Sequence, residues 1–198
     1  MKRSLFLSAA FALAALVAPS LAHATPWEVD SSHSAASFSV RHLMVSNVRG
    51  ELGKITGSIN VDDKDITKST VEASIEMAGI NTRDAKRDEH LRSPDFFDVA
   101  KFPNITFKST KVEKAGAGLK VTGNLTLHGV TKEVVLNVEG PAPATKDPWG
   151  NTKSGFTATT KLNRKDFGVT WNKSVDGGGV VVGEEVSVTI DLEVNKKK

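Results

Sequence analysis

Apolar and polar residues alternate with a period of two over most of the chain. In the clearest example, every second residue from Val186 to Val194 is apolar, and polar residues fill all of the positions between them. Successive side chains of a strand point to opposite faces, so this pattern predicts strands with one buried face. It recurs about eight times, over residues 37–42, 50–61, 71–77, 105–108, 119–127, 134–138, 156–162 and 186–194.

Turn-forming residues separate these predicted strands. They are Asp62-Asp63, residues 115–118 (AGAG), His128-Gly129, Gly140-Pro141 and residues 176–179 (DGGG). Several short strands with polar outer faces and little helix are typical of an all-β protein, either an antiparallel barrel or a sandwich. Gly57 and Gly123 lie inside strand patterns, where a strongly bent barrel strand needs them. The chain has no internal repeat, and we predict one domain.

One charged segment, residues 81–97, breaks the alternation. Asn81 or Thr82 could cap a short helix from Arg83 to Leu91, because their side chains accept hydrogen bonds from free N–H groups. Ser93-Pro94-Asp95 has the pattern of a second helix start, with Ser as the cap and Pro in the first turn. Residues 140–154 are rich in Gly, Pro and polar residues and are interpreted as a mobile surface loop.

The first 24 residues have the pattern of a cleavable secretory signal peptide. Lys2 and Arg3 precede a mostly apolar run over residues 5–17, and Ala22-His23-Ala24 supplies the small-x-small cleavage motif. The apolar run is too short to cross a bilayer as a stable helix, and no second apolar segment follows. We therefore predict a cleaved signal over residues 1–24 and a single domain over residues 25–198.

Composition narrows the possible functions. The chain has 198 residues, with 26 basic and 23 acidic side chains. The predicted signal contains two of the basic residues and none of the acidic ones, so the remaining 174 residues carry a net charge of +1. This leaves no basic surface of the kind that nucleic-acid binding requires. The chain has no cysteine, which excludes disulfides, thiolate metal sites and thiol catalysis, and export without disulfides fits a bacterial periplasm.

Candidate catalytic and metal-binding residues are few. The histidines after the signal are His33, His42, His90 and His128, and none has a metal-ligand spacing to another. Asp30, His33 and Ser34 have the residue types of an acyl-transfer triad. However, they lie within five positions, where a His rarely bridges the other two, and the chain has no G-x-S-x-G motif. We predict no catalytic residue, metal or cofactor, and interpret Asp30 and the serines after it as a turn before the first strand.

The densest charged cluster, residues 83–92, has two interpretations. The first is an exposed helix face with ion pairs at helical spacing, such as Asp84 with Arg87 and Asp88 with Arg92. The second is a lid over one mouth of a barrel that presents Arg and His side chains to a polar or anionic ligand head.

Several motifs, taken in order, resemble those of the YceI-like family, the periplasmic polyisoprenoid-binding proteins of bacteria. The resemblance runs from Trp27 to about Val194. The motifs are Trp27-x-x-Asp30-x-x-His33-Ser34, Phe38-x-Val40-x-His42, Gly50, Gly57, Arg87-Asp88-Glu89-His90-Leu91-Arg92-Ser93, Asp95-Phe96-Phe97-Asp98, Phe102-Pro103-x-Ile105-x-Phe107, Val121-x-Gly123-x-Leu125-x-Leu127-x-Gly129-Val130-Thr131 and Arg164-x-Asp166-Phe167-Gly168.

The resemblance implies a lipocalin-like, extended, eight-stranded antiparallel β-barrel with a short helical segment near one mouth. It also implies a long apolar cavity that holds the isoprenoid tail of a lipid or quinone. Eight strands close a barrel that is just wide enough for one slender ligand, so the pattern and the resemblance agree. Phe102 stands where the family commonly has Tyr, so a hydrogen bond from a phenol to a ligand head is missing here.

Strand alternation and the resemblance together predict the ligand-binding residues. These are Phe38, Val40, His42, Arg87, Asp88, His90, Leu91, Phe96, Phe97, Ile105, Phe107, Leu125, Leu127 and Phe167. The resemblance implies periplasmic binding, storage or transport of an amphiphilic isoprenoid lipid, without catalysis, by a monomer or homodimer that does not insert stably into a membrane. Two alternatives stay open: binding of another hydrophobe, such as a fatty amide or a lipophilic antibiotic, and an enzyme acting on a lipid head group with His90 and Asp88 as acid and base.

Overall fold

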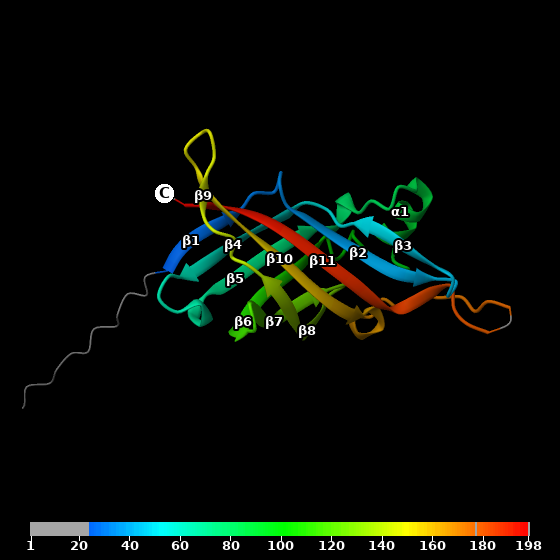
Figure 1. The fold of residues 1–198 in the computed structure, drawn as a ribbon. Helices are drawn as coiled ribbons and strands as arrows, with labels where there is room; N and C mark the ends of the chain where they lie inside the picture. Colours follow the sequence, from blue (N-terminus) through cyan, green and yellow to red (C-terminus); the bar gives the residue numbers. More distant parts are fainter. Residues whose placement is uncertain (1–23, 177, 198) are drawn as a thin grey trace, which may run out of the picture.

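The computed structural model describes residues 24–176 and 178–197, which form one curved antiparallel sheet (Figure 1). Its strands are β1 (Ala24–Val29), β2 (Ala35–His42), β3 (Ser46–Glu51), β4 (Ile55–Asp62), β5 (Thr70–Glu76), β6 (Asn104–Ala115), β7 (Gly118–Leu127), β8 (Val130–Glu139), β9 (Thr145–Lys146), β10 (Thr152–Asn163) and β11 (Val182–Lys196). The helical elements are α1 (Ala85–Arg92) and the 3₁₀ turns η1 (Ile66–Lys68), η2 (Met77–Gly79) and η3 (Arg164–Phe167).

The sheet closes into a barrel because β11 pairs with β10 on one side and with β1 and β2 on the other. β1 and β2 follow one another along β11, so they share one position in the barrel wall. β3 pairs with β2 and β4 pairs with β1, so these two strands share the next position. With β5, β6, β7, β8, β10 and β11, the wall has eight positions. The predicted eight-stranded antiparallel barrel is therefore confirmed.

The core lies in two groups of buried side chains inside this wall. The larger group joins β1, β4, β5 and β11 through residues such as Trp27, Ile55 and Val194. The smaller group joins β6, β7, β8 and β10 through Val112, Val121, Val138 and Ala158. Along most strands the apolar positions face these groups, and the polar positions between them face outward, as the alternation predicts.

Two of the predicted strand boundaries are wrong. Residues 24–29 form β1, although the first strand was predicted to begin after the turn at Asp30. The predicted strand over residues 50–61 is broken between β3 and β4, at Gly53. A Cβ atom at Gly53 would lie 1.8 Å from the Glu76 carbonyl oxygen, so the backbones there approach too closely for any larger residue. The break lets the chain bend between β3 and β4, which share this position in the barrel wall.

The predicted short helix is present as α1, which begins two residues later and ends one residue later than expected. Its cap is Asp84, whose carboxylate accepts a hydrogen bond from the Arg87 N–H at 3.1 Å, rather than Asn81 or Thr82. No second helix starts at Ser93, because this residue instead ends α1 and is followed by a turn. Over residues 24–176 and 178–197, no helix combines the length and the apolar character needed to span a membrane.

Part of the predicted surface loop over residues 140–154 is ordered into a hairpin. Thr145–Lys146 forms β9 and pairs with Thr152 and Lys153 at the start of β10. The Asp147 carboxylate holds the turn between them by accepting hydrogen bonds from Trp149 and Asn151. In Figure 1 this segment projects beside β1 and the C-terminal end of β11.

Candidate functional site

An apolar cavity of about 220 Å³ runs inside the barrel. Its lining extends from Leu119, next to the β6–β7 hairpin, to Phe167 and Val169, beyond the end of β10. Almost every lining residue is apolar; the exceptions are Ser69, Thr160 and Arg164. A long and apolar lining can exclude water from a ligand's tail, but it offers few groups that could carry out chemistry.

The alternation on β6 and β7 shows how the sequence builds this lining. Ile105 and Phe107 point inward, while Lys108 points outward and pairs with Glu72 of β5 at 2.7 Å. Across the strand pair, Gly123 leaves room for the Phe107 ring, because a Cβ atom at Gly123 would lie 2.5 Å from it. The absent side chain therefore lets a large aromatic ring lie over β7 inside the barrel.

Ten of the fourteen predicted ligand-binding residues line the cavity. They are Phe38, Val40, Leu91, Phe96, Phe97, Ile105, Phe107, Leu125, Leu127 and Phe167. His42, Arg87, Asp88 and His90 lie outside the lining. His42 ends β2, where it pairs with Ser46 and Val182. Contact of any of the fourteen with a ligand stays a prediction.

Arg87 and Asp88 hold the turn that precedes α1. The buried Asp88 carboxylate accepts hydrogen bonds from both the N–H and the hydroxyl of Thr82. Arg87 donates from Nε to the Thr82 hydroxyl oxygen at 2.7 Å and from Nη2 to the Thr82 carbonyl at 2.9 Å. The expected pair of Arg87 with Asp84 is present at 3.9 Å, whereas Arg92 donates to the Ile80 carbonyl instead of to Asp88. These contacts favour the structural interpretation of the charged cluster.

His90 belongs to a small aromatic group at the same end of the barrel. Its ring makes edge contacts with Phe96 and with Trp171, each at 5.0 Å between ring centres. Its Nε2 atom lies 2.9 Å from the Asp95 carboxylate. His90 and Asp88 therefore have different partners and do not form the acid–base pair that an enzyme on a lipid head group would need.

Arg164 was not among the predicted ligand-binding residues, yet it is the one charged residue in the cavity lining among the described residues. Its guanidinium donates to the carbonyls of Gly183 at 2.8 Å, Val169 at 2.7 Å and Val182 at 3.3 Å. Burial lowers the pKa of Arg164 from its ordinary value, and the charge of Glu184 opposes this. Arg164 belongs to the motif Arg164-x-Asp166-Phe167-Gly168, from which only Phe167 was predicted to bind the ligand.

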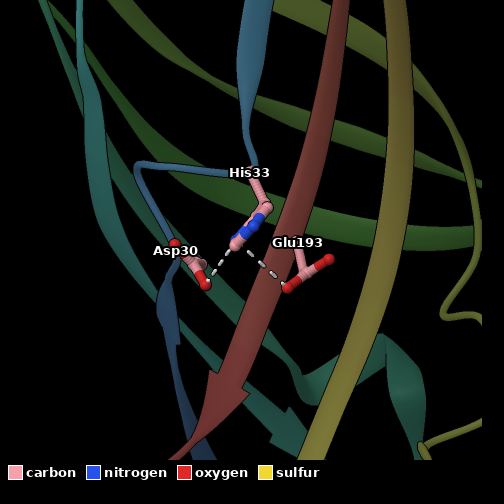
Figure 2. A group of neighbouring side chains, drawn as sticks. All are labelled: Asp30, His33 and Glu193. Atoms are coloured by element: carbon pink, nitrogen blue, oxygen red, sulfur yellow. Dashed lines mark hydrogen bonds and ion pairs between the residues drawn. The ribbon is translucent and has the colours of Figure 1, made fainter. Parts of the chain in front are cut away.

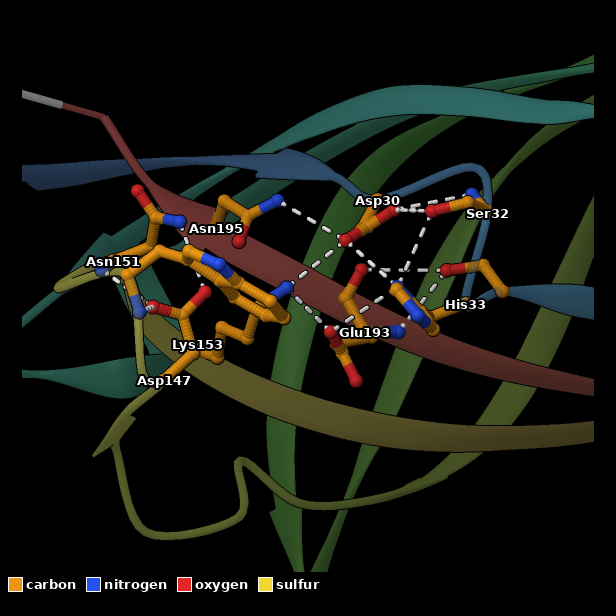
Figure 3. Close-up of polar contacts among 10 residues, drawn as sticks. Asp30, Ser32, His33, Asp147, Asn151, Lys153, Glu193 and Asn195 are labelled. Carbon is orange, nitrogen blue, oxygen red and sulfur yellow. Dashed lines mark hydrogen bonds and ion pairs between the residues drawn. The ribbon is translucent and has the colours of Figure 1, made fainter.

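A second polar cluster lies where the β1–β2 connection meets β10 and β11. Figure 2 shows His33 between the carboxylates of Asp30 and Glu193, with its Nδ1 atom 3.0 Å from one and 3.6 Å from the other. Figure 3 shows the Lys153 ammonium group joining the same carboxylates, at 2.9 Å from Asp30 and 2.6 Å from Glu193. None of these four residues lines the cavity.

This cluster has the side chains of a metal site or a triad, but its contacts fit neither. Asp30, His33 and Glu193 bring potential ligand atoms within 4.8 Å of one another. The carboxylate oxygens that would bind a metal already contact the Lys153 ammonium. A catalytic His also needs different ring nitrogens for nucleophile and acid, whereas Ser32 and Asp30 both contact Nδ1 of His33. The cluster ties the β1–β2 connection to β10 and β11.

The charge of Asp30 is strongly favoured in this cluster. Hydrogen bonds from the Ser32 hydroxyl, from His33 and from Lys153 hold the pKa of the Asp30 carboxyl far below its usual range. Hydrogen bonds to Glu193 and Asp30 raise the pKa of Lys153. A depressed carboxyl pKa stabilises the folded state above the unfolded pKa of about 3.9, and this stabilisation is lost as the pH falls.

We therefore expect Asp30→Asn to lower the free energy of unfolding at pH 7 by about 1–3 kcal/mol, since partly buried charge-assisted hydrogen bonds are lost. Urea unfolding of the variant and the wild type, measured from pH 7 to pH 2, should give a difference that shrinks below about pH 4. The exposed Glu133→Gln serves as the control and should change little at any pH. A difference that stays constant across this range would contradict the role assigned to Asp30.

The fold and the cavity together define a class, the small β-barrels that enclose an apolar ligand cavity. Residues 27–194 match the family model of the YceI-like domain, and the chain belongs to the YceI-like family. A UPF0312 protein of Vibrio cholerae serotype O1 (strain M66-2) is 40% identical over 173 residues, which cover 85% of this chain and 89% of that protein. A UPF0312 protein of Shewanella baltica (strain OS195) is 38% identical over 172 residues, which cover 85% of this chain and 88% of the relative.

Solved structures share the fold. The crystal structure of the Campylobacter jejuni YCEI protein matches with a TM-score of 0.67 at 32% identity, over 80% of this chain and 90% of that one. Burkholderia cenocepacia BcnA matches with a TM-score of 0.70 at 22% identity, over 83% and 98% of the two chains. A polyisoprenoid binding domain from Saccharophagus degradans matches with a TM-score of 0.59 at 15% identity, over 86% and 98%.

Proposed function

We propose that the protein binds an amphiphilic isoprenoid lipid, a polyprenyl chain or an isoprenoid quinone, in the periplasm and stores or carries it. The apolar cavity is the observation that carries this proposal. A cavity of about 220 Å³ whose lining extends along the whole barrel suits a slender chain better than a compact ligand. The description of the Saccharophagus degradans neighbour as a polyisoprenoid binding domain supports the same class of ligand.

The energetics allow the lipid to enter and to leave. A prenyl chain that moves from water into the barrel and buries several hundred Å² gains on the order of 10 kcal/mol, at about 25 cal/mol per Å². A chain that moves from a bilayer gains far less, because it exchanges one apolar environment for another. The protein can therefore keep a tail out of water and still exchange it with a membrane.

The predicted signal peptide supports the periplasmic part of the proposal. Residues 1–23 of that signal lie outside the described residues, and Ala24, its last residue, begins β1. The proposed cleavage after Ala24 would leave Thr25 and the rest of β1 in the barrel wall.

A series of prenyl alcohols of increasing length (geraniol, farnesol, geranylgeraniol and longer) tests the proposal. Affinity, measured by native mass spectrometry or by quenching of tryptophan fluorescence, should rise with each added isoprene unit and level off when the tail fills the cavity. Affinity that does not depend on tail length would place the ligand outside the barrel and overturn the proposal.

Another hydrophobe on the same barrel is the second candidate, because an apolar lining selects by width and length more than by chemical identity. Linear alcohols with the same numbers of carbon atoms separate the two candidates. Tighter binding of the methyl-branched chains would favour the isoprenoid, and equal binding would favour a general carrier of hydrophobes.

A further inference from the structure

The connection between β2 and β3 exposes three large apolar side chains in a row. Leu43, Met44 and Val45 are 40%, 54% and 75% exposed. Single exposed apolar residues are ordinary on a protein surface, but three consecutive ones at the end of a hairpin form a small apolar patch. In Figure 1 the turn between β2 and β3 lies at one end of the barrel, beside the loop that precedes β11. We call Leu43, Met44 and Val45 the hairpin tip.

The backbone of the hairpin tip is strained. The turn is closed by a hydrogen bond from the Val45 N–H to the His42 carbonyl at 3.1 Å. Its two central residues, Leu43 and Met44, have φ angles of 48° and 60°. Such turns normally carry Asn-Gly, because large side chains disfavour this conformation. Strain of this kind in large apolar residues that stay 40–75% exposed points to a function.

The tip is nevertheless held in a defined position. The Leu43 N–H donates to the Val181 carbonyl at 2.9 Å, which fixes the turn to the loop before β11. The Arg41 Nη2 atom donates to the Met44 carbonyl at 2.8 Å. Strand β2 and the loop before β11 thus hold the tip in place with its apolar side chains exposed.

Basic side chains surround the tip. Arg41 and Arg49 are exposed and lie on the same face of the hairpin, since Arg41 pairs with Asn47 and Arg49 with Ser39. Lys173, also exposed, belongs to the adjoining loop, where its carbonyl accepts a hydrogen bond from the Val181 N–H. The same loop carries one exposed carboxylate, Asp176. These three basic side chains outnumber the one carboxylate, so the net charge of these four side chains is positive.

The size and chemistry of this surface fit a lipid bilayer better than a protein. A stable protein interface needs roughly 20–30 residues from each partner, far more than a three-residue tip supplies. A peripheral membrane contact needs only a few apolar side chains at the depth of the headgroups and basic side chains around them.

We propose that the hairpin tip inserts into the surface of a bilayer with anionic headgroups, and that Arg41, Arg49 and Lys173 contact those headgroups. This inference rests on the proposed function, because a carrier of an insoluble tail has to collect or deliver it at a membrane. The end of the barrel that carries the tip is then the end that faces the bilayer.

Flotation with lipid vesicles tests the proposal, using the protein purified from a periplasmic extract. Vesicles are made of phosphatidylcholine alone or with a quarter of phosphatidylglycerol. The tip variant is Met44→Asn with Val45→Ser, which removes apolar surface without adding charge. Asn accepts a positive φ more readily than Met, so the fold is preserved. The control is Trp149→Ser, which removes an 83% exposed apolar side chain from the hairpin between β9 and β10.

We expect the wild type to bind the anionic vesicles, the tip variant to lose at least tenfold in partitioning, and Trp149→Ser to stay within twofold of the wild type. Arg49→Gln with Lys173→Gln should weaken binding to the anionic vesicles and leave binding to phosphatidylcholine unchanged. A wild type that does not bind vesicles, a tip variant that binds as well as the wild type, or an equal loss for Trp149→Ser would overturn the proposal.

Binding of prenyl alcohols added in solvent separates this inference from the proposed function. The tip variant should bind them as the wild type does, because none of its changed residues lines the cavity. A wild type that binds vesicles but takes up no prenyl alcohol would overturn the proposed function. The flotation result would still support the membrane contact.

Discussion

Val194→Asp is expected to unfold the protein at 25 °C. Val194 is fully buried, with an exposed fraction of 0%, at the point where β11 pairs with Val29 of β1 and with Ser154 of β10. A carboxylate at this point would be surrounded by apolar side chains and would cost at least 4 kcal/mol. That cost is a large part of the 5–15 kcal/mol that stabilises a typical domain, and it falls on the seam that closes the barrel.

Val135→Asp is the matched control, since the same chemical change is made at a valine that is 44% exposed on β8. We expect it to change the free energy of unfolding by about 0.5 kcal/mol or less. Urea unfolding can be followed by the fluorescence of Trp27, which is buried in the same core group as Val194. If Val194→Asp unfolds cooperatively at a urea concentration near that of the wild type, β11 does not close the barrel against β1 and β10 as described.

Ala73→Trp is expected to lower ligand affinity at least tenfold while the barrel stays folded. Ala73 lies on β5 with its methyl group in the cavity lining, opposite Gly57 of β4 and Phe107 of β6. An indole ring at this position would project into a cavity of only about 220 Å³ and occupy space that a tail would use. The stability cost should stay near 1–3 kcal/mol, the usual cost of overpacking.

Ser74→Trp places the same ring on the neighbouring position of β5, which points to the other face of the sheet. It should leave binding of geranylgeraniol unchanged. Isothermal titration of both variants, with the melting temperature of each as a check on folding, gives the comparison. Equal affinities of Ala73→Trp and the wild type would show that the ligand does not use this cavity.

The barrel could be predicted from the sequence because alternation is a local signal. β7 and β11 each carry a run of inward apolar and outward polar residues long enough to read without structural information. β1 was missed because it is short and contains Pro26, which weakens a strand pattern. The break at Gly53 was missed because its cause, the close approach of the Glu76 carbonyl, is a contact across strands.

The candidate site could be predicted only in part, because alternation shows which side chains face inward but not what they meet. Val194 and Met77 face inward and are fully packed, whereas Leu125 and Leu127 face inward and border the cavity. A pattern with period two is the same for all four residues. Only the curvature of the closed barrel decides where space is left.

The roles of the charged residues were even harder to predict from the sequence. The cluster around Arg87 attracted attention by its density, yet its main partner is Thr82, a residue that looked only like a possible cap. Arg164 is isolated in the sequence and lies in the cavity lining, where three carbonyl groups surround its guanidinium. The partners of a charged side chain are set by tertiary contacts, so local charge density is a weak guide to its role.

The content of the barrel is the most direct test of isoprenoid binding. The protein is purified without detergent from a bacterium that makes quinones and prenyl phosphates, and is then denatured and extracted with organic solvent. Mass spectrometry of the extract should show an isoprenoid lipid in near-stoichiometric amount, and the same preparation of Ala73→Trp should contain at least tenfold less. Repeated recovery of wild-type protein without any bound lipid, together with no uptake of added isoprenoids, would contradict the account.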